Sequence, residues 1–246
     1  MTHQPSLANP RLWADRRAHY LTVFERALML LREKAELPED EPNLTRELSF
    51  TVVAARLEID PDGRFERPRF EAQSLADPDY EGIPPHEHKR PDIQWVHDDD
   101  AAADDRHREK SFVLECKRLG RTTASGWKLN EQYAVNGVAR FRCEECRYGN
   151  HMAEGAMIAF VQNMDFDAIQ AEVNQHLRTA GIPLLERDDQ GVKERAVSHL
   201  DHQFRRSFPI SPFHLRHLWL DIRDIKTKQR ITPKKSPPKP SPRAAK

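Results

Sequence analysis

The chain has 246 residues, enough for one sizeable hydrophobic core, and its 38% hydrophobic and 32% charged residues are typical of a folded, strongly hydrated protein. Its 39 basic and 39 acidic residues give a formal net charge of zero, so any surface that attracts nucleic acid must be local. No apolar run approaches the roughly 20 residues of a membrane span, the N-terminus lacks the apolar segment of a signal peptide, and three cysteines do not indicate a secreted disulfide framework. We therefore expect a cytoplasmic protein that does not associate with a membrane.

The first part of the chain is predicted to be helical. Residues 10–36 carry apolar side chains at largely helical spacing, and this pattern ends before Pro38. A second helix is expected from Asn43 through Leu57, with Asn43 or Thr45 as its cap. Residues 59–89 are rich in Pro, Asp, Glu and His, so we expect little regular structure there.

Two short apolar segments, residues 90–96 and 110–119, predict a β-hairpin. Both are rich in β-branched and aromatic residues and are bounded by turn formers. The acidic insert between them, residues 97–105, lacks the glycine and the terminal glutamate of an EF-hand calcium loop. We expect that insert to be a solvated tip of the hairpin.

Side chains alternate between the two faces of a strand, and this places charge on one face of the second segment. One face is apolar throughout and carries Phe112, Leu114 and Cys116. The other face carries Val113, Glu115 and Lys117. A carboxylate and an ammonium group therefore share one face of an otherwise hydrophobic strand.

This pattern indicates metal-assisted chemistry. A hard cation such as Mg²⁺ or Mn²⁺ prefers oxygen ligands, which Asp92, Glu115 and the backbone carbonyl of Cys116 would supply. Lys117 would position a water molecule and offset negative charge that develops on phosphorus, which is the requirement of phosphodiester hydrolysis. The simpler interpretation, a surface hairpin whose charges only pair with one another, remains an alternative.

The remaining segments complete an α/β pattern. We expect a helix over residues 128–146, a buried strand over 155–161, a helix from Asp165 closed by Gly181, and a final strand over 214–221. The strand, helix and strand from residue 110 to 161 predict a crossover between two parallel strands. Cys143 and Cys146 with His151 could form three ligands of a zinc site, but a helix end with two ordinary thiols is the simpler expectation.

The order Pro91-Asp92 and then Glu115-x-Lys117 on the next strand resembles the PD-(D/E)xK nuclease superfamily. Residues 130–161 are similar to the helix and small-residue strand that follow the active-site lysine in bacterial members linked to defence against foreign DNA. The resemblance covers residues 43–222. It implies a restriction-endonuclease-like core, a mixed β-sheet flanked by helices, and Mg²⁺-dependent or Mn²⁺-dependent DNA cleavage in restriction or antiphage defence. It also implies that Glu47, on the helix before the hairpin, adds an acidic group near the metal.

The sequence therefore predicts an N-terminal helix (residues 1–42), a nuclease-like domain (43–224) and a disordered Lys/Pro-rich tail (225–246). Lys234, Lys235 and Lys239 of that tail would contact DNA phosphates without sequence preference. A partner protein of a defence system and a homodimer are both compatible with this function. The alternative function is a noncatalytic nucleic-acid-binding or assembly subunit of a defence or repair complex that keeps the same fold.

Overall fold

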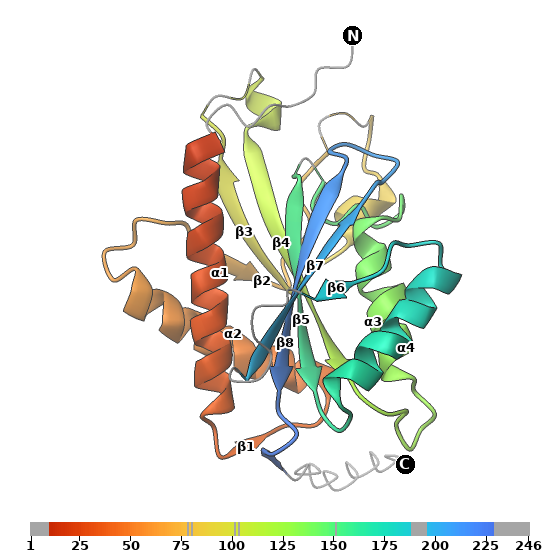
Figure 1. The fold of residues 1–246 in the computed structure, drawn as a ribbon. Helices are drawn as coiled ribbons and strands as arrows, with labels where there is room; N and C mark the ends of the chain where they lie inside the picture. Colours follow the sequence, from red (N-terminus) through yellow and green to blue (C-terminus); the bar gives the residue numbers. More distant parts are fainter. Residues whose placement is uncertain are drawn as a thin grey trace, which may run out of the picture.

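The computed structural model describes residues 10–228 apart from residues 78, 80, 101, 103, 151 and 188–195. A mixed seven-stranded sheet with the order β2-β3-β4-β5-β8-β7-β6 passes through the middle of the molecule (Figure 1). Its strands are β2 (Pro68–Phe70), β3 (Ile93–Asp98), β4 (Glu109–Leu119), β5 (Glu154–Val161), β6 (Glu186–Arg187), β7 (Val197–Phe204) and β8 (Phe213–Asp221). The helices are α1 (Pro10–Arg32), α2 (Glu41–Ile59), α3 (Leu129–Asn136) and α4 (Phe166–Thr179). The α/β class predicted from the sequence is confirmed.

The strand pairing agrees with the expected connections. β3 and β4 form an antiparallel hairpin, and β4 runs parallel to β5 after the crossover through α3. β8 is the predicted final strand of this sheet and lies parallel to β5. Two short strands, β1 (Glu36–Leu37) and β9 (Lys226–Thr227), pair with each other outside the main sheet. Among the residues described, no helix has the length and apolar character needed to cross a membrane.

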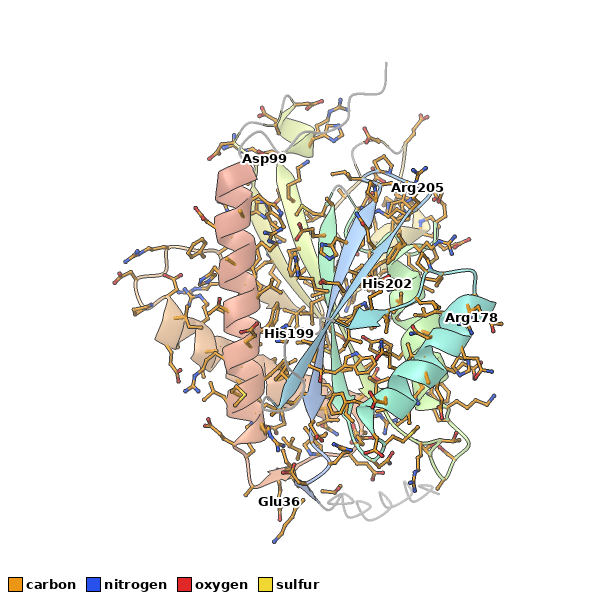
Figure 2. All side chains as sticks on the ribbon, viewed as in Figure 1. Glu36, Asp99, Arg178, His199, His202 and Arg205 are labelled. Carbon is orange, nitrogen blue, oxygen red and sulfur yellow. The ribbon has the colours of Figure 1, made fainter. Side chains whose placement is uncertain are left out.

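Helices cover both faces of the sheet, with α1 and α2 on one face and α3 and α4 on the other (Figure 1). Side chains fill the space on both sides of the sheet (Figure 2). His199 and His202 of β7 point to opposite faces. His199 Nε2 lies 3.6 Å from Glu25 of α1, whereas His202 Nε2 is bonded to the Pro183 carbonyl after α4. The sheet therefore separates two hydrophobic cores.

α1 is part of the first of these cores. Its Tyr20 and Phe24 are fully buried, and the Tyr20 ring stacks on Trp95 of β3 with 4.5 Å between ring centroids. α2 adds Leu44, Leu48 and Val52 to the same core. α1 and α2 therefore share one hydrophobic core across the domain boundary predicted between residues 42 and 43.

The predicted alternation along β4 is present. Phe112, Leu114 and Cys116 pack in the core beneath α1 and α2, and Val113 and Leu119 pack in the core beneath α3 and α4. Glu115 and Lys117 have the parity of Val113 and lie toward α3. An apolar strand surface thus holds two charged side chains beneath a helical layer.

Three predicted helix boundaries were wrong. α1 ends at Arg32 and not at residue 36, and the cap of α2 is Asp40, whose carboxylate accepts hydrogen bonds from the Asn43 backbone and side chain. The helix predicted over residues 128–146 ends at Asn136, and a short 3-10 turn over Val138–Phe141 follows it. Gly137 makes this break and packs against the strands, as a Cβ there would lie 2.6 Å from Met157 Cε. The described part of residues 59–89 is largely irregular, as predicted, and contains β2 and a 3-10 turn over Pro85–His88.

Candidate functional site

Asp92 lies at the start of β3, where the hairpin register brings it beside the middle of β4. Ile93 pairs with Leu114, so the residue before Ile93 meets the next part of β4. There Asp92 Oδ2 accepts a hydrogen bond of 2.6 Å from the backbone N–H of Cys116. The predicted partners Asp92 and Glu115 are thus brought together by the pairing of the two strands.

Lys117 ties the site together with three hydrogen bonds. Its Nζ donates to Glu115 Oε1, to the Cys116 carbonyl oxygen and to Glu41 Oε1, each at 2.8 Å. An ammonium group has three donors, so all of them are used. The side chains of Lys117 and Glu115 are only 9% and 1% exposed, which makes this a buried charge cluster. A surface hairpin with solvated ion pairs does not describe it.

The acidic residue that α2 brings to this cluster is Glu41, in the first turn of the helix. Glu41 Oε2 also accepts from the backbone N–H of Arg118 at 3.2 Å. Glu47, which we expected in this place, instead forms an ion pair with Lys34. Glu47 is six positions after Glu41, which is about 9 Å farther along the helix axis.

Arg140 is a second basic residue of the site, and the sequence analysis did not single it out. Its Nη1 donates to Glu115 Oε1 at 2.5 Å and to the Tyr148 hydroxyl at 3.4 Å. The Arg140 side chain is 36% exposed, so it links buried Glu115 to the surface. The break at Gly137 positions Arg140, because the chain leaves the axis of α3 there and continues as a 3-10 turn beside β4.

Burial controls the protonation of these groups. It raises the pKa of Asp92 to about 7, and the nearby Glu115 carboxylate adds to that rise. Burial also raises the pKa of Glu115, although Lys117 and Arg140 oppose it. For Lys117, burial lowers the pKa, but the carboxylates of Glu115 and Glu41 outweigh this and raise it above its usual value. Lys117 is therefore a stable ammonium at neutral pH, while Asp92 titrates there.

The oxygens of the site suit a hard cation, although they do not form a complete set of side-chain ligands. Within the described residues, no three His, Cys, Asp or Glu side chains are grouped as a metal site. Asp92 and Glu115 supply two carboxylates, and the Cys116 carbonyl supplies a third oxygen ligand. Glu115 Oε2 is buried, and no hydrogen bond from the described residues reaches it. A buried carboxylate oxygen that lacks a donor fits Mg²⁺ or Mn²⁺, which keeps several water ligands beside one or two carboxylates.

Two predicted groups fall wholly or partly outside the described part of the chain. Lys234, Lys235 and Lys239 lie beyond residue 228, so the structure does not place them. His151 is also outside it, whereas Cys143 and Cys146 are partly buried free thiols after the 3-10 turn. The zinc site therefore stays an untested alternative.

Comparisons with protein-family models, with curated proteins and with solved structures found no match.

Proposed function

We propose that the protein is a metal-dependent phosphodiesterase that cuts DNA as an endonuclease. The observation that supports this most strongly is the convergence of Asp92, Glu115, the Cys116 carbonyl and Lys117 at one buried point of the β3–β4 hairpin. Two strands that pair in this register give two carboxylates and an ammonium group on a rigid support. Such a set combines cation binding with stabilisation of charge on phosphorus.

Asp92, Glu115 and the Cys116 carbonyl would hold Mg²⁺ or Mn²⁺. When bound, the cation would act as a Lewis acid on a phosphate oxygen and favour ionisation of water. In the loaded site, Lys117 Nζ would donate to the attacking water and to a phosphate oxygen in place of Glu115 and the Cys116 carbonyl. Glu41 remains the counter-ion of Lys117 and takes up the proton that the water loses. The water oxygen forms the new bond to phosphorus as the bridging P–O bond breaks, and the departing oxygen takes a proton from solvent water.

We assign Arg140 as an additional catalytic residue, on the basis of its position beside Glu115. It contacts Glu115 from the solvent side, so it can donate to a nonbridging oxygen of a phosphate that approaches the site. A positive charge there stabilises the negative charge that builds up in the transition state.

The restriction-endonuclease-like fold belongs to the same proposal. An acidic residue from the helix before the hairpin and a parallel strand after the next helix both agree with the resemblance, with Glu41 in the role expected of Glu47. We place the activity in the cytoplasm, in restriction or antiphage defence, with DNA as substrate.

A noncatalytic nucleic-acid-binding subunit is the competing function, and one observation favours it. Lys117 bonds both Glu115 and the Cys116 carbonyl, so the site is closed by its own ammonium group. A protein that never exchanges this contact for a cation would bind nucleic acid without cutting it.

Cleavage of supercoiled and linear DNA by the purified protein, with Mg²⁺, with Mn²⁺ or with a chelator, tests the proposal. RNA of the same sequence serves as a parallel substrate. We expect metal-dependent cutting of DNA that Lys117→Ala and Glu115→Gln abolish. The matched pair is Glu41→Gln, which should slow cutting by roughly tenfold or more as an acid–base group is lost, and Glu47→Gln on the same helix, which should not. DNA binding without metal-dependent cutting would instead establish the noncatalytic function.

A further inference from the structure

A cavity of about 250 Å³ lies on the β3–β4 hairpin beside the candidate site. Gln94, Ser111 and Val113 belong to its lining, and the hairpin register puts Gln94 opposite Val113. Val113 has the same parity as Glu115, so both side chains are on the same face of β4. Strands advance about 3.3 Å per residue, which puts this part of the cavity about 7 Å from Glu115 along the strand. The cavity therefore adjoins the acidic cluster on one continuous face.

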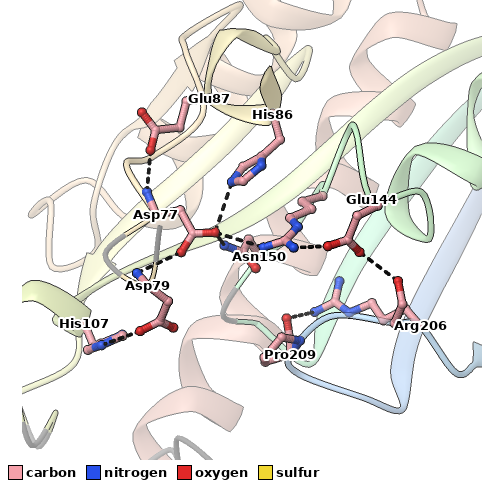
Figure 3. Close-up of polar contacts among 11 residues, drawn as sticks. Asp77, Asp79, His86, Glu87, His107, Glu144, Asn150, Arg206 and Pro209 are labelled. Carbon is pink, nitrogen blue, oxygen red and sulfur yellow. Dashed lines mark hydrogen bonds and ion pairs between the residues drawn. The ribbon is translucent and has the colours of Figure 1, made fainter. Parts of the chain in front are cut away.

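One wall of the cavity is fixed by a buried carboxylate, that of Asp77 (Figure 3). Asp77 Oδ2 accepts hydrogen bonds from Arg147 Nη1 at 3.1 Å and from Asn150 Nδ2 at 3.0 Å, and His86 Nε2 lies 3.1 Å away. Arg147, Asn150 and His86 all line the cavity. The segment before β3 and the loop before β5, which are distant in sequence, are thus held together by a single side chain that is 1% exposed. Such a wall is organised before any ligand arrives.

On the side of the lining formed by β4 and the loop after the 3-10 turn, Ser111 and Asn150 keep unused hydrogen-bond acceptors. Gln94 Nε2 donates to the carbonyl groups of residues 72 and 73, and Gln94 Oε1 accepts from Ser111 Oγ, so both amide protons are used and the Ser111 oxygen keeps its lone pairs. Asp77 can only accept, which fixes the Asn150 amide with its Nδ2 toward Asp77. Asn150 Oδ1 is then an acceptor with no hydrogen-bond partner among the described residues. A ligand that complements Ser111 and Asn150 must bring N–H donors.

We propose that this cavity binds one nucleobase that carries an exocyclic amino group, which is adenine, cytosine or guanine, next to the phosphodiester at Asp92 and Glu115. This inference rests on the nuclease function proposed above. The cavity is smaller than the roughly 300–1,000 Å³ of sites for drug-sized ligands, so it suits a single ring system. Its lining includes two imidazole rings, His86 and His107, a ring type on which bases stack. Thymine has no amino group and offers only one N–H.

A base inside a duplex cannot reach such a cavity, because its edge is paired and its faces are stacked. The substrate base must come from a single strand or must be flipped out of the helix. The structure therefore favours cutting at single-stranded or unpaired DNA, beside a base that is amino-bearing.

Two assays on the full-length protein test the cavity and the function separately. The first measures binding of adenosine, cytidine and thymidine by ligand-observed NMR in the presence of a chelator. Ala76 lines the cavity and is exposed, so Ala76→Trp should block the cavity without disturbing the core. Ala54→Trp, at an exposed position of α2 away from the cavity lining, is the matched control. The second maps the cut positions in single-stranded oligonucleotides with Mg²⁺.

We expect adenosine and cytidine to bind about tenfold more tightly than thymidine, as one hydrogen bond to a buried acceptor would provide. Ala76→Trp should abolish nucleoside binding and the base preference of cutting while cleavage itself persists, and Asn150→Ala should remove the preference for amino-bearing bases. Asp92→Asn should stop cleavage but leave nucleoside binding intact. Cleavage without base preference, unchanged by Ala76→Trp, overturns the cavity assignment and leaves the nuclease standing. If Ala76→Trp blocks nucleoside binding but the wild type cuts DNA under no condition, the nuclease function is overturned and the base site stands. If the wild type neither binds nucleosides nor cuts DNA, both proposals are overturned.

Discussion

Replacing Asp92 by Asn should stabilise the protein above neutral pH and have almost no effect near pH 4. Burial holds the pKa of the folded carboxyl at about 7, against an ordinary value of 3.8. The folded protein therefore keeps a proton that the unfolded chain releases between pH 3.8 and 7, so this group makes the folded state less stable as the pH rises through that window. Asn is neutral at all pH values, and its Oδ1 can accept the hydrogen bond from the Cys116 N–H.

The pKa difference sets the size of the effect. A shift of this size corresponds to roughly 4 kcal/mol of unfolding free energy at pH 8. Asp92 is only partly shielded from solvent, so screening lowers this, and we expect the Asn variant to be more stable by about 2 to 4 kcal/mol at pH 8.

Urea unfolding at pH values from 4 to 8, in a chelating buffer and followed by circular dichroism, measures this difference. Asp62→Asn is the control, because Asp62 lies in a turn with a side chain that is 70% exposed. A stability difference between the two proteins that is the same at pH 4 and pH 8, or a wild type that is more stable than the Asn variant at pH 8, would refute the reasoning. Saturating Mg²⁺ should then stabilise the wild type by about 2 to 3 kcal/mol at a hundredfold excess over its dissociation constant, but not the Asn variant.

Three further substitutions have expected results that unfolding experiments check. Gly137→Ala would put a Cβ 2.5 Å from the Tyr133 carbonyl and 3.3 Å from Lys117 Cγ, so it should cost about 1–3 kcal/mol and reduce DNA cleavage; normal stability with full cleavage would contradict this. Tyr133→Phe removes the hydroxyl that bonds Trp219 Nε1 and His217 Nδ1 in a buried network, and should cost about 1–3 kcal/mol; a neutral effect would show that these groups find other partners. Arg206→Lys should destabilise almost as much as Arg206→Met, because one ammonium cannot reach the Tyr148, Gly149, Met152 and Ile210 carbonyls together; recovery with Lys would argue that the positive charge alone matters.

The sequence predicted the hairpin and its charged face because both depend on a period of two. Once residues 90–96 and 110–119 are strands, the alternation fixes which side chains share a face, and Glu115 and Lys117 are bound to point the same way. The position of Asp92 beside Cys116 follows from the register of the same pair. The crossover to β5 was predictable for a similar reason, since a buried apolar strand that follows a helix joins its neighbour in parallel.

Glu41 and Arg140 were missed because their positions depend on where helices begin and end. A cap at Asn43 or Thr45, as the sequence predicts, leaves Glu41 in the preceding loop, whereas Asp40 caps the helix and Glu41 is in its first turn. Asp40 followed by Pro42 carries the signal that identifies this start, as a capping carboxylate before a proline in the first turn. For Arg140 the relevant signal is Gly137, which the sequence analysis took as a position within a long helix. A glycine alone does not end a helix, and what decides the break is the packing of Gly137 against Met157 and Lys117, which are distant in sequence.

The charge balance of the site explains why a buried ionic cluster is tolerated in this fold. Asp92, Glu115 and Glu41 bring three negative charges when ionised, and Lys117 and Arg140 bring two positive charges. Burial raises the pKa of Asp92 to about 7, so protonation of that one group makes the cluster neutral and avoids an unpaired buried charge. Loss of this proton would leave the cluster with one excess negative charge. A bound divalent cation would change that to one excess positive charge, which complements the single negative charge of a phosphodiester.

Metal binding should therefore release about one proton per protein near pH 6, and should release almost none at pH 8, where Asp92 is already ionised. Calorimetric titration with Mg²⁺ in buffers of different ionisation enthalpy measures this number, and equal proton release at both pH values would contradict the assignment of Asp92 as the titrating ligand.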